Sequence, residues 1–469
     1  MSQSQTLIPW GGLEFPENAL QPHSFVIGSP GSGKTLMLRL QMKNALLDWS
    51  GALKARALIY DGKREFYPLL IGMGVSPRDI RVLLPTDRRS VPWDIAADID
   101  TPEDTRTLAK SLAPGNEKGS SNEDFFSRAT QAILGGVLWS LHLARPRRWN
   151  LYDVVDAMRS ESTIDAVLSF NDQSRSIFKT YINQPKQGSA VLSTLLNDIV
   201  LPFETTAALW KRSTRPGFSL KEWIKTPRSS VLLMMPDPTT TSVQPINRAM
   251  FHWAAQLLDS QPEISVLGPD HETWIFLDEF RFANELPLLD HLLAKGRSKG
   301  IHITLASQTI EGIVDVYGEN RTFDMMSNAA NLAVLRLATS PSTEKVAKLF
   351  GQQEVWEEDF GQSKTKNYKN GLFNWWAESL SYSTSSNKKR TLKDVVLSST
   401  LTDFPAANAK NGVHGLFRTP SIGTWKGPIP WSFVRKHLSE PSGDEAYSRR
   451  PVEDFLPVDK KRPPQKDEP

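Results

Sequence analysis

The residues from Ser24 to Thr35 read SFVIGSPGSGKT and combine a glycine-rich turn with a lysine and a hydroxyl side chain. Their spacing matches G-x-x-x-x-G-K-[ST], a pattern in which backbone N–H groups surround the phosphates of a nucleotide. Lys34 is expected to reach the β- and γ-phosphates, and Thr35 is expected to ligate Mg²⁺. The stretch therefore predicts ATP and Mg²⁺ as cofactors. The predicted phosphate-binding residues are Gly28, Ser29, Pro30, Gly31, Ser32, Gly33, Lys34 and Thr35.

A second stretch, Thr273 to Phe280 (TWIFLDEF), places two carboxylates at the end of an apolar run. Sheets of the α/β class bind ligands at the carboxyl ends of their strands. Asp278 is expected to hold Mg²⁺ through its water shell, and Glu279 to orient and polarise the attacking water. An apolar run that ends in Asp-Glu is equally compatible with a structural role, and its combination with the phosphate loop favours the catalytic interpretation.

The stretch from Leu292 to Thr309 (LLAKGRSKGIHITLASQT) predicts a helix, a turn and a strand that ends at Gln308. A polar residue beside the Asp-Glu strand can contact the γ-phosphate, so Gln308 is a candidate sensor. Arg297 lies at the end of an element that could face a neighbouring subunit, and an arginine supplied in trans stabilises transition-state charge. The alternatives are a helix-capping turn arginine and an ordinary strand end.

Strands and helices alternate on both sides of a long helical segment. This alternation predicts an α/β, P-loop (RecA-like) fold with a doubly wound, mostly parallel sheet. Helical periodicity without strands between the two parts predicts an inserted all-α domain, although helices that merely layer the sheet are the alternative. The proline-rich, charged end of the chain predicts disorder. The expected divisions are a nucleotide-binding domain at 1–97 and 216–438, an all-α insertion domain at 98–215, and a disordered tail at 439–469.

Composition excludes several classes of site. The 469 residues contain no cysteine, which rules out disulfides, zinc–thiolate sites and cysteine nucleophiles. A formal net charge of +3 permits nucleic-acid binding without arguing for it. The first twelve residues lack the features of a signal peptide, and the longest apolar stretch, 132–144, is too short to span a bilayer. We therefore expect a soluble cytoplasmic protein.

Four segments resemble the type IV secretion coupling proteins, the TraD-like group of the FtsK/HerA superfamily: Leu277-Asp278-Glu279-Phe280, Leu289 to Leu293, Gly296-Arg297-Ser298, and Gln308. The run Asp61-Gly62-Lys63-Arg64-Glu65 is similar to that group's D-P-K-G-E segment, from which Gly62 and Arg64 depart. The predicted helical insertion resembles the group's all-α domain. The resemblance covers most of residues 24–350 and, more weakly, 390–430.

The resemblance implies a ring-shaped homo-hexameric ATPase that moves DNA through a central channel, often handing a relaxase-bound strand to a conjugative secretion channel. Family members that dock on such a channel usually begin with two transmembrane helices, which this sequence lacks ahead of its first strand. We therefore expect any association with the inner membrane to be peripheral and to depend on a partner. The implied roles are nucleotide binding by Lys34 and Thr35, hydrolysis by Asp278 and Glu279, an arginine finger at Arg297 and a sensor at Gln308.

Two other functions stay open at this point. One is a soluble HerA-like or FtsK-like DNA motor in repair or defence, which differs in its partner and not in its mechanism. The other is a nucleotide-gated adaptor that recruits a relaxase or effector through the helical domain.

The DNA-contact surface is also open. Lysines and aromatics between 364 and 390 could track phosphates and stack on bases. A flexible polar loop, with its tryptophans packed on its own domain, is the favoured alternative. A further candidate lies in the helical insertion at Arg145, Arg147 and Arg148. The candidate between 364 and 390 consists of Lys364, Lys366, Lys369, Trp375, Trp376, Lys388, Lys389 and Arg390.

Overall fold

The structure is a computed structural model that describes residues 7–20, 22–115, 121–184, 187–338, 341–368 and 378–455. At 121–123, 342, 352–368, 378–394 and 452 the description covers the backbone alone. The chain divides into two compact units, Met1–Leu335 with Pro405–Pro469, and Arg336–Phe404.

The larger unit is built on a nine-stranded sheet in the order β13-β12-β9-β3-β8-β7-β4-β6-β5. The strands from β9 to β5 run parallel to one another, and β12 and β13 add an antiparallel hairpin beside β9. This architecture confirms the predicted doubly wound, mostly parallel sheet. The strands are β3 (Ser24–Ile27), β4 (Arg56–Asp61), β5 (Ile80–Val82), β6 (Val231–Met234), β7 (Thr273–Asp278), β8 (Ile301–Ser307), β9 (Asn331–Leu335), β12 (Val413–Thr419) and β13 (Gly423–Ile429).

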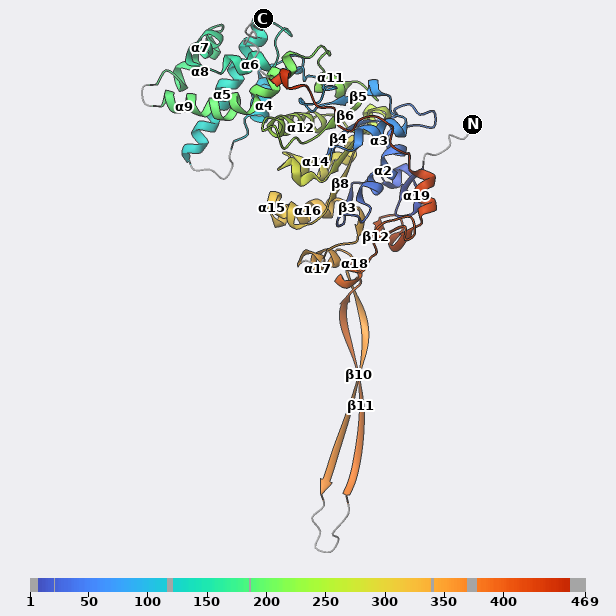
Figure 1. Cartoon of the computed structure of the whole chain (residues 1–469). Helices are drawn as coiled ribbons and strands as arrows, with labels where there is room; N and C mark the ends of the chain where they lie inside the picture. Colours follow the sequence, from blue (N-terminus) through green and yellow to red (C-terminus); the bar gives the residue numbers. More distant parts are fainter. Residues whose placement is uncertain are drawn as a thin grey trace, which may run out of the picture. The chain divides into compact units, whose positions relative to one another are not determined.

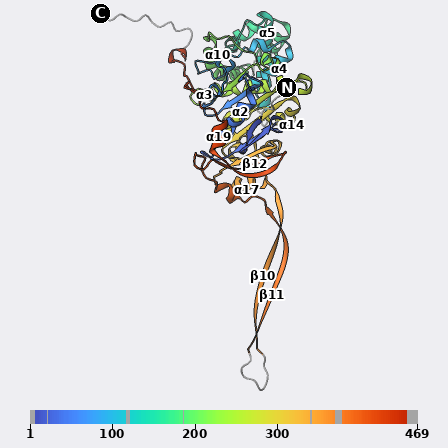
Figure 2. The same ribbon diagram turned by 90° about the vertical axis from the view of Figure 1, so that its right-hand side faces the viewer.

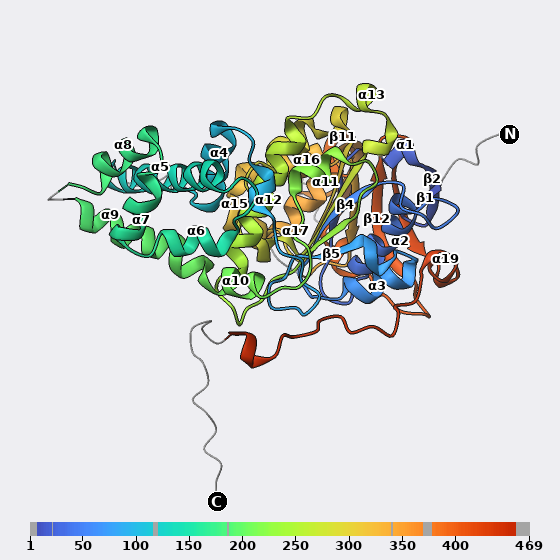
Figure 3. The ribbon, with the colours of Figure 1, turned by 90° about the horizontal axis from the view of Figure 1, so that it is seen from above.

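Helices cover both faces of this sheet, which is why its central strands are continuous apolar runs. Every residue of β3, β4, β7 and β8 is buried. One face carries α2 (Lys34–Leu46), α3 (Phe66–Met73) and α19 (Trp431–His437), and the other carries α12 (Val243–Asp259), α14 (Leu289–Lys295) and α16 (Glu319–Asn328) (Figures 1 and 3). A short hairpin, β1 (Leu7–Trp10) and β2 (Leu13–Pro16), packs beside α2 and buries Trp10.

A helical insertion follows β5 and gathers at one end of the larger unit (Figures 1 and 2). Two of its helices begin directly after Thr101 and Asn150, which form capping boxes. No helix in the described part of the chain is both long enough and apolar enough to cross a bilayer. The elements of the helical insertion are α4 (Pro102–Leu112), α5 (Ser121–Ala144), α6 (Leu151–Ala157), α7 (Glu161–Leu168), α8 (Asp172–Tyr181), α9 (Gly188–Leu195), a π-helical turn (Leu196–Val200) and α10 (Leu201–Lys211).

The buried carboxylate of Asp98 holds together the two ends of the helical insertion. It accepts hydrogen bonds from the indole N–H of Trp93, which precedes the insertion, and from the hydroxyl of Ser219, which follows it. The backbone N–H of Lys221 also donates to Asp98, at 2.9 Å. These bonds lie near the predicted limits of the all-α domain at 98 and 215, and the limits themselves stay predictions.

The smaller unit contains two long antiparallel strands, β10 (Gln352–Tyr368) and β11 (Glu378–Asp394), with α17 (Pro341–Lys348) and α18 (Ser398–Thr402) (Figure 1). Their register pairs Glu357 with Lys389 and Glu358 with Lys388. The polar composition of these residues did not distinguish paired strands from a loop. The expected flexible loop is therefore wrong for the described residues. Lys369, Trp375 and Trp376 lie outside the described part.

The chain after α19 runs along the larger unit toward α10 (Figure 3). Backbone hydrogen bonds join Ser442 to Pro68 and Arg450 to Thr86, both at 2.9 Å. The guanidinium of Arg212 at the end of α10 donates to the carbonyl of Glu453 at 3.0 Å. Residues 439–455 thus differ from the expected disorder, because hydrogen bonds to the larger unit and the packing of Tyr447 against its core hold them. Residues 456–469 lie outside the described part.

The path of this segment leads to a first prediction. A Cβ added at Gly72 in α3 would lie 1.9 Å from the carbonyl oxygen of Glu440. We therefore expect Gly72→Ala to displace residues 439–455 and to lower the free energy of unfolding by about 1–3 kcal/mol. A Cβ at Gly443 meets no atom within 4 Å, so Gly443→Ala is the matched control. Equal midpoints of thermal unfolding for Gly72→Ala and Gly443→Ala would show that the contact between Gly72 and Glu440 is absent in solution.

Candidate nucleotide site

Adjacent parallel strands end at one edge of the sheet and carry most of the predicted site residues. Strand β8 lies between β3 and β7, and its register pairs Ser307 with Ile27 and Ala306 with Asp278. The backbone N–H of Gly28 donates to the carbonyl of Ser307 at 3.2 Å. This strand order brings the phosphate loop, the two carboxylates and Gln308 to one place. Their location at one edge is observed, whereas their catalytic and binding roles stay predictions.

The phosphate loop has the geometry that its glycines allow. Gly31 and Gly33 adopt φ values of 73° and 104°, in the left-handed region. A Cβ at Gly28 would lie 2.4 Å from the hydroxyl oxygen of Ser32, so a side chain there would fill the loop. Helix α2 begins directly after the loop, at Lys34, and its first N–H groups are available to an anion. Thr35, its second residue, is half-buried.

Lys34 is folded back onto its own loop. Its Nζ donates to the carbonyl of Gly28 at 2.6 Å and to that of Ser29 at 3.4 Å. Burial lowers the pKa of Lys34 to about 8, and the negative charge of Glu279 opposes that shift. The ammonium therefore has carbonyl partners but no directly paired anion among the described residues. A phosphate oxygen would supply that negative charge.

The carboxylates of Asp278, the last residue of β7, and of Glu279, which follows it, are buried and incompletely paired. Neither oxygen of Asp278 has a hydrogen-bond partner among the described residues, and burial raises its pKa to about 6. One oxygen of Glu279 accepts the backbone N–H of Gln308 at 3.3 Å and lies 3.1 Å from Nε of Arg281. The other oxygen of Glu279 has no partner in the described part. The backbone of Glu279 has a φ of 52°, which is uncommon for a residue with a side chain.

These unpartnered atoms fit a magnesium nucleotide. Buried polar groups in proteins are normally hydrogen-bonded, so a cluster of exceptions indicates a ligand site. The hydroxyl of Ser32 is also buried without a partner among the described residues. Carboxylate and hydroxyl oxygens are the ligands that Mg²⁺ prefers, and the loop N–H groups suit phosphates.

Arg297 is the one predicted catalytic residue that the fold does not bring to this edge. It is exposed in a short 3₁₀ turn (Gly296–Lys299) that precedes β8, whereas Gln308 follows β8. The seven residues of β8 separate the two ends by about 23 Å. Arg297 instead lies near His23. The pKa of His23 falls to about 4, chiefly through burial and further through the charges of His302 and Arg297. Arg297 therefore cannot reach the nucleotide site of its own chain.

Two basic residues at the site were not predicted. Arg281 pairs with Glu279, and Lys63 lies close enough to influence the pKa values of both Lys34 and Asp278. Asp61 shapes the loop of Lys63 by accepting the backbone N–H of Phe66 at 2.7 Å. Lys63 belongs to the run 61–65, which is similar to the D-P-K-G-E segment of the coupling proteins, but that similarity gave Lys63 no role. No sequence signal pointed to Arg281.

Comparison with known proteins adds independent evidence. The family model described as the type IV secretion-system coupling protein DNA-binding domain matches residues 7–417. A bacterial conjugative coupling protein, TrwBdeltaN70 in its unbound form, superposes with a TM-score of 0.70 at 18% identity, over 95% of this chain and 92% of that chain. The plasmid coupling protein TrwB has been solved with ADP and Mg²⁺ and with the ATP analogue ADPNP. Each superposes with a TM-score of 0.68 at 17% identity, over 96% and 93% of the two chains. No curated protein sequence gives a match. At this identity the structures establish the fold.

The isolated carboxylate of Asp278 gives a second prediction. Its folded pKa is raised, so the folded protein binds more protons than the unfolded chain between about pH 4 and pH 6, and this costs stability as the pH rises. We expect Asp278→Asn to raise the free energy of unfolding at pH 8 by on the order of 2–3 kcal/mol, and to give no gain at pH 4.

The control for this measurement is Asp87→Asn. Asp87 is equally buried but pairs with Arg89 at 2.6 Å, so removal of its charge should destabilise the protein. Nucleotide-free protein is unfolded with denaturant at both pH values. A loss of stability in Asp278→Asn at pH 8 would mean that Asp278 has a partner in solution.

Proposed function

The chain belongs to the family of type IV secretion-system coupling proteins, and on this basis we propose that it is a P-loop ATPase that uses ATP hydrolysis to move DNA. The observation that carries the proposal is the sheet edge where Lys34, Asp278, Glu279 and Gln308 come together. Family membership favours this reading over a soluble repair or defence motor and over a nucleotide-gated adaptor.

The loop from Gly28 to Gly33 and the start of α2 bind the phosphates, with Lys34 turning from its carbonyl partners to the β- and γ-phosphates. Thr35 and Asp278 would hold Mg²⁺, which would supply positive charge to neutralise the phosphate oxygens. The TrwB structures with ADP and Mg²⁺ and with ADPNP support the same cofactors here.

Hydrolysis requires a positioned water and stabilisation of the developing charge. Glu279 orients and polarises the water, because its free oxygen is buried beside the phosphate loop. Arg281 holds the other oxygen of Glu279, and so acts as a positioning residue. Gln308 senses the γ-phosphate from the end of β8, and its backbone N–H already links it to Glu279.

Arg297 acts on a neighbouring subunit. It is exposed at the edge of the sheet opposite to the phosphate loop, so a head-to-tail ring can present it to the next nucleotide site. Such a ring is proposed to be a homo-hexamer that encloses DNA. A relaxase and components of a secretion channel are the proposed protein partners.

The activity itself is tested by ATP turnover with and without DNA. We expect DNA to stimulate turnover by the wild-type chain and Lys34→Ala to abolish it, since the phosphates lose their cation. Glu279→Gln should still bind ATP but should lower turnover by about 100-fold or more. Arg106→Ala, an exposed arginine on α4, is the control and should turn over normally. Turnover that DNA leaves unchanged would favour the adaptor function.

The trans role of Arg297 is tested by mixing two inactive variants. A Lys34→Ala subunit still offers Arg297 to its neighbour, and an Arg297→Ala subunit still offers a complete phosphate loop. Random assembly of equal amounts should therefore restore about a quarter of the subunit interfaces, and activity should recover in proportion. Mixtures that stay inactive, although gel filtration shows mixed rings, would contradict a finger supplied in trans.

A further inference from the structure

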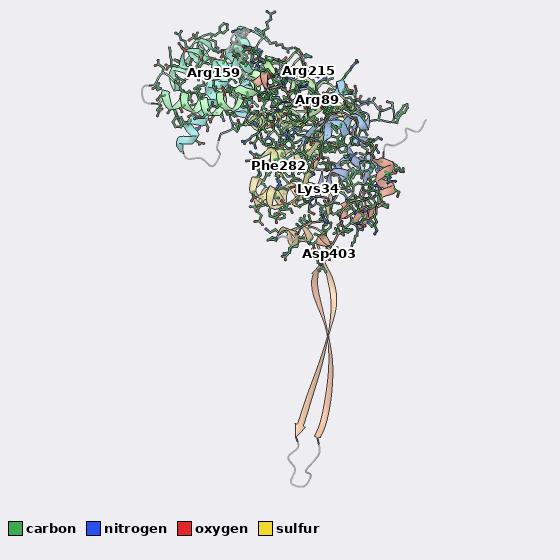
Figure 4. The ribbon with its side chains drawn as sticks, in the orientation of Figure 1. Lys34, Arg89, Arg159, Arg215, Phe282 and Asp403 are labelled. Carbon is green, nitrogen blue, oxygen red and sulfur yellow. The ribbon has the colours of Figure 1, made fainter. Side chains whose placement is uncertain are left out.

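A cavity of about 330 Å³ opens at the base of the helical insertion. Three segments form its wall: residues 92–94 before the insertion, 147–152 between α5 and α6, and 207–217 around the end of α10. Arg215 on this wall lies well apart from Lys34 of the nucleotide site (Figure 4). The cavity is thus a separate site with its own chemistry.

The wall of the cavity is strongly cationic. It carries Arg147, Arg148, Lys211 and Arg215 against a single carboxylate, that of Asp94. Within the described chain, no carboxylate forms an ion pair with Arg148, Lys211 or Arg215, and the pair between Arg147 and Asp100 is long, at 3.9 Å. Asp94 is occupied as the cap that accepts the backbone N–H of Ala97. The positive charge is therefore available to an anionic ligand.

Aromatic rings lie among these cations. Tyr152 is half-buried, and Nζ of Lys211 lies 3.4 Å from the centroid of its ring. Trp93 and Trp210 also line the cavity, but their indole N–H groups donate to Asp98 and Ser90. Trp149 is only 4% exposed, and its indole nitrogen has no hydrogen-bond partner among the described residues. Tyr152 is therefore the aromatic residue of this wall that a ligand can reach.

We propose that this cavity binds one nucleotide unit, with its phosphate among Arg148, Lys211 and Arg215 and its base against the ring of Tyr152. Cations that meet a phosphate beside an aromatic ring that stacks on a base are the elements of single-strand recognition. The cavity volume also suits a ligand of about this size. An acidic peptide would satisfy the charge, but it would leave the aromatic wall unused.

Two sources can supply this chemistry, a free nucleotide or a single-stranded segment of DNA. The DNA source rests on the proposed function, and it would place a contact for the transported strand in the helical insertion. The free nucleotide is independent of it. Binding is therefore measured in a Lys34→Ala background, which removes nucleotide binding at the phosphate loop and does not depend on hydrolysis.

The cavity variants are Arg215→Glu and Tyr152→Ala. The matched control is Arg175→Glu, because Arg175 on α8 is also exposed and also lacks an ion pair among the described residues, but lies outside the cavity. Thermal unfolding midpoints equal to that of the parent confirm that each variant is folded. The probes are a fluorescent short oligothymidylate, followed by anisotropy, and dTMP, followed by tryptophan quenching.

We expect both cavity variants to weaken binding of a probe by about 10-fold or more, and Arg175→Glu to leave it unchanged. With the oligonucleotide, Arg215→Glu should also reduce the slope of log affinity against log salt by about 0.7. Effects on the oligonucleotide identify DNA as the source, and effects on dTMP alone identify a free nucleotide. If the cavity variants leave the binding of both probes unchanged, the proposal is overturned.

Discussion

The nucleotide site depends on negative charge that is buried without a hydrogen-bond donor among the described residues. Asp278 and Glu279 end a fully buried strand, and three of their four carboxylate oxygens have no hydrogen-bond partner among the described residues. Such charge is costly to desolvate, so a fold retains it where a ligand supplies the missing partners. Lys34 is a buried cation that likewise lacks a partner of opposite charge. Burial lowers its pKa, and its ammonium donates hydrogen bonds to backbone carbonyls. A magnesium-bound triphosphate would satisfy all of these groups together.

The order of the strands explains how the site is assembled from distant segments. Placing β8 between β3 and β7 sets Gln308 between the phosphate loop and the carboxylates. The same strand begins at the opposite edge, directly after the turn that holds Arg297. One rigid strand therefore connects the residue proposed to sense the γ-phosphate with the residue proposed to act on the next subunit.

Sequence patterns predicted the parts of this fold that local chemistry determines. The phosphate loop has a fixed spacing, and TWIFLDEF ends a strand in two adjacent acids, so both could be found without coordinates. Alternation of apolar runs and helices predicted the mostly parallel sheet. The resemblance to coupling proteins, first seen in a few short segments, is borne out over residues 7–417.

Features that depend on long-range pairing were not predictable in this way. The β12–β13 hairpin and residues 439–455 are held by bonds to segments far away in sequence. Lys63 and Arg281 became visible only when their loops were placed beside Asp278 and Glu279. The β10–β11 hairpin joins two polar segments, whose pairing their composition did not indicate.

The most direct test of the central claim is the number of protons exchanged when the magnesium–ADPNP complex binds. Calorimetry in buffers of different ionisation enthalpy measures this number for the wild-type chain and for Asp278→Asn, and the difference between the two is the contribution of Asp278. Since the pKa of Asp278 is about 6, we expect Asp278 to release about half a proton on binding at pH 6. Proton numbers that are equal in the wild-type chain and in Asp278→Asn would contradict a site in which Asp278 meets the magnesium nucleotide.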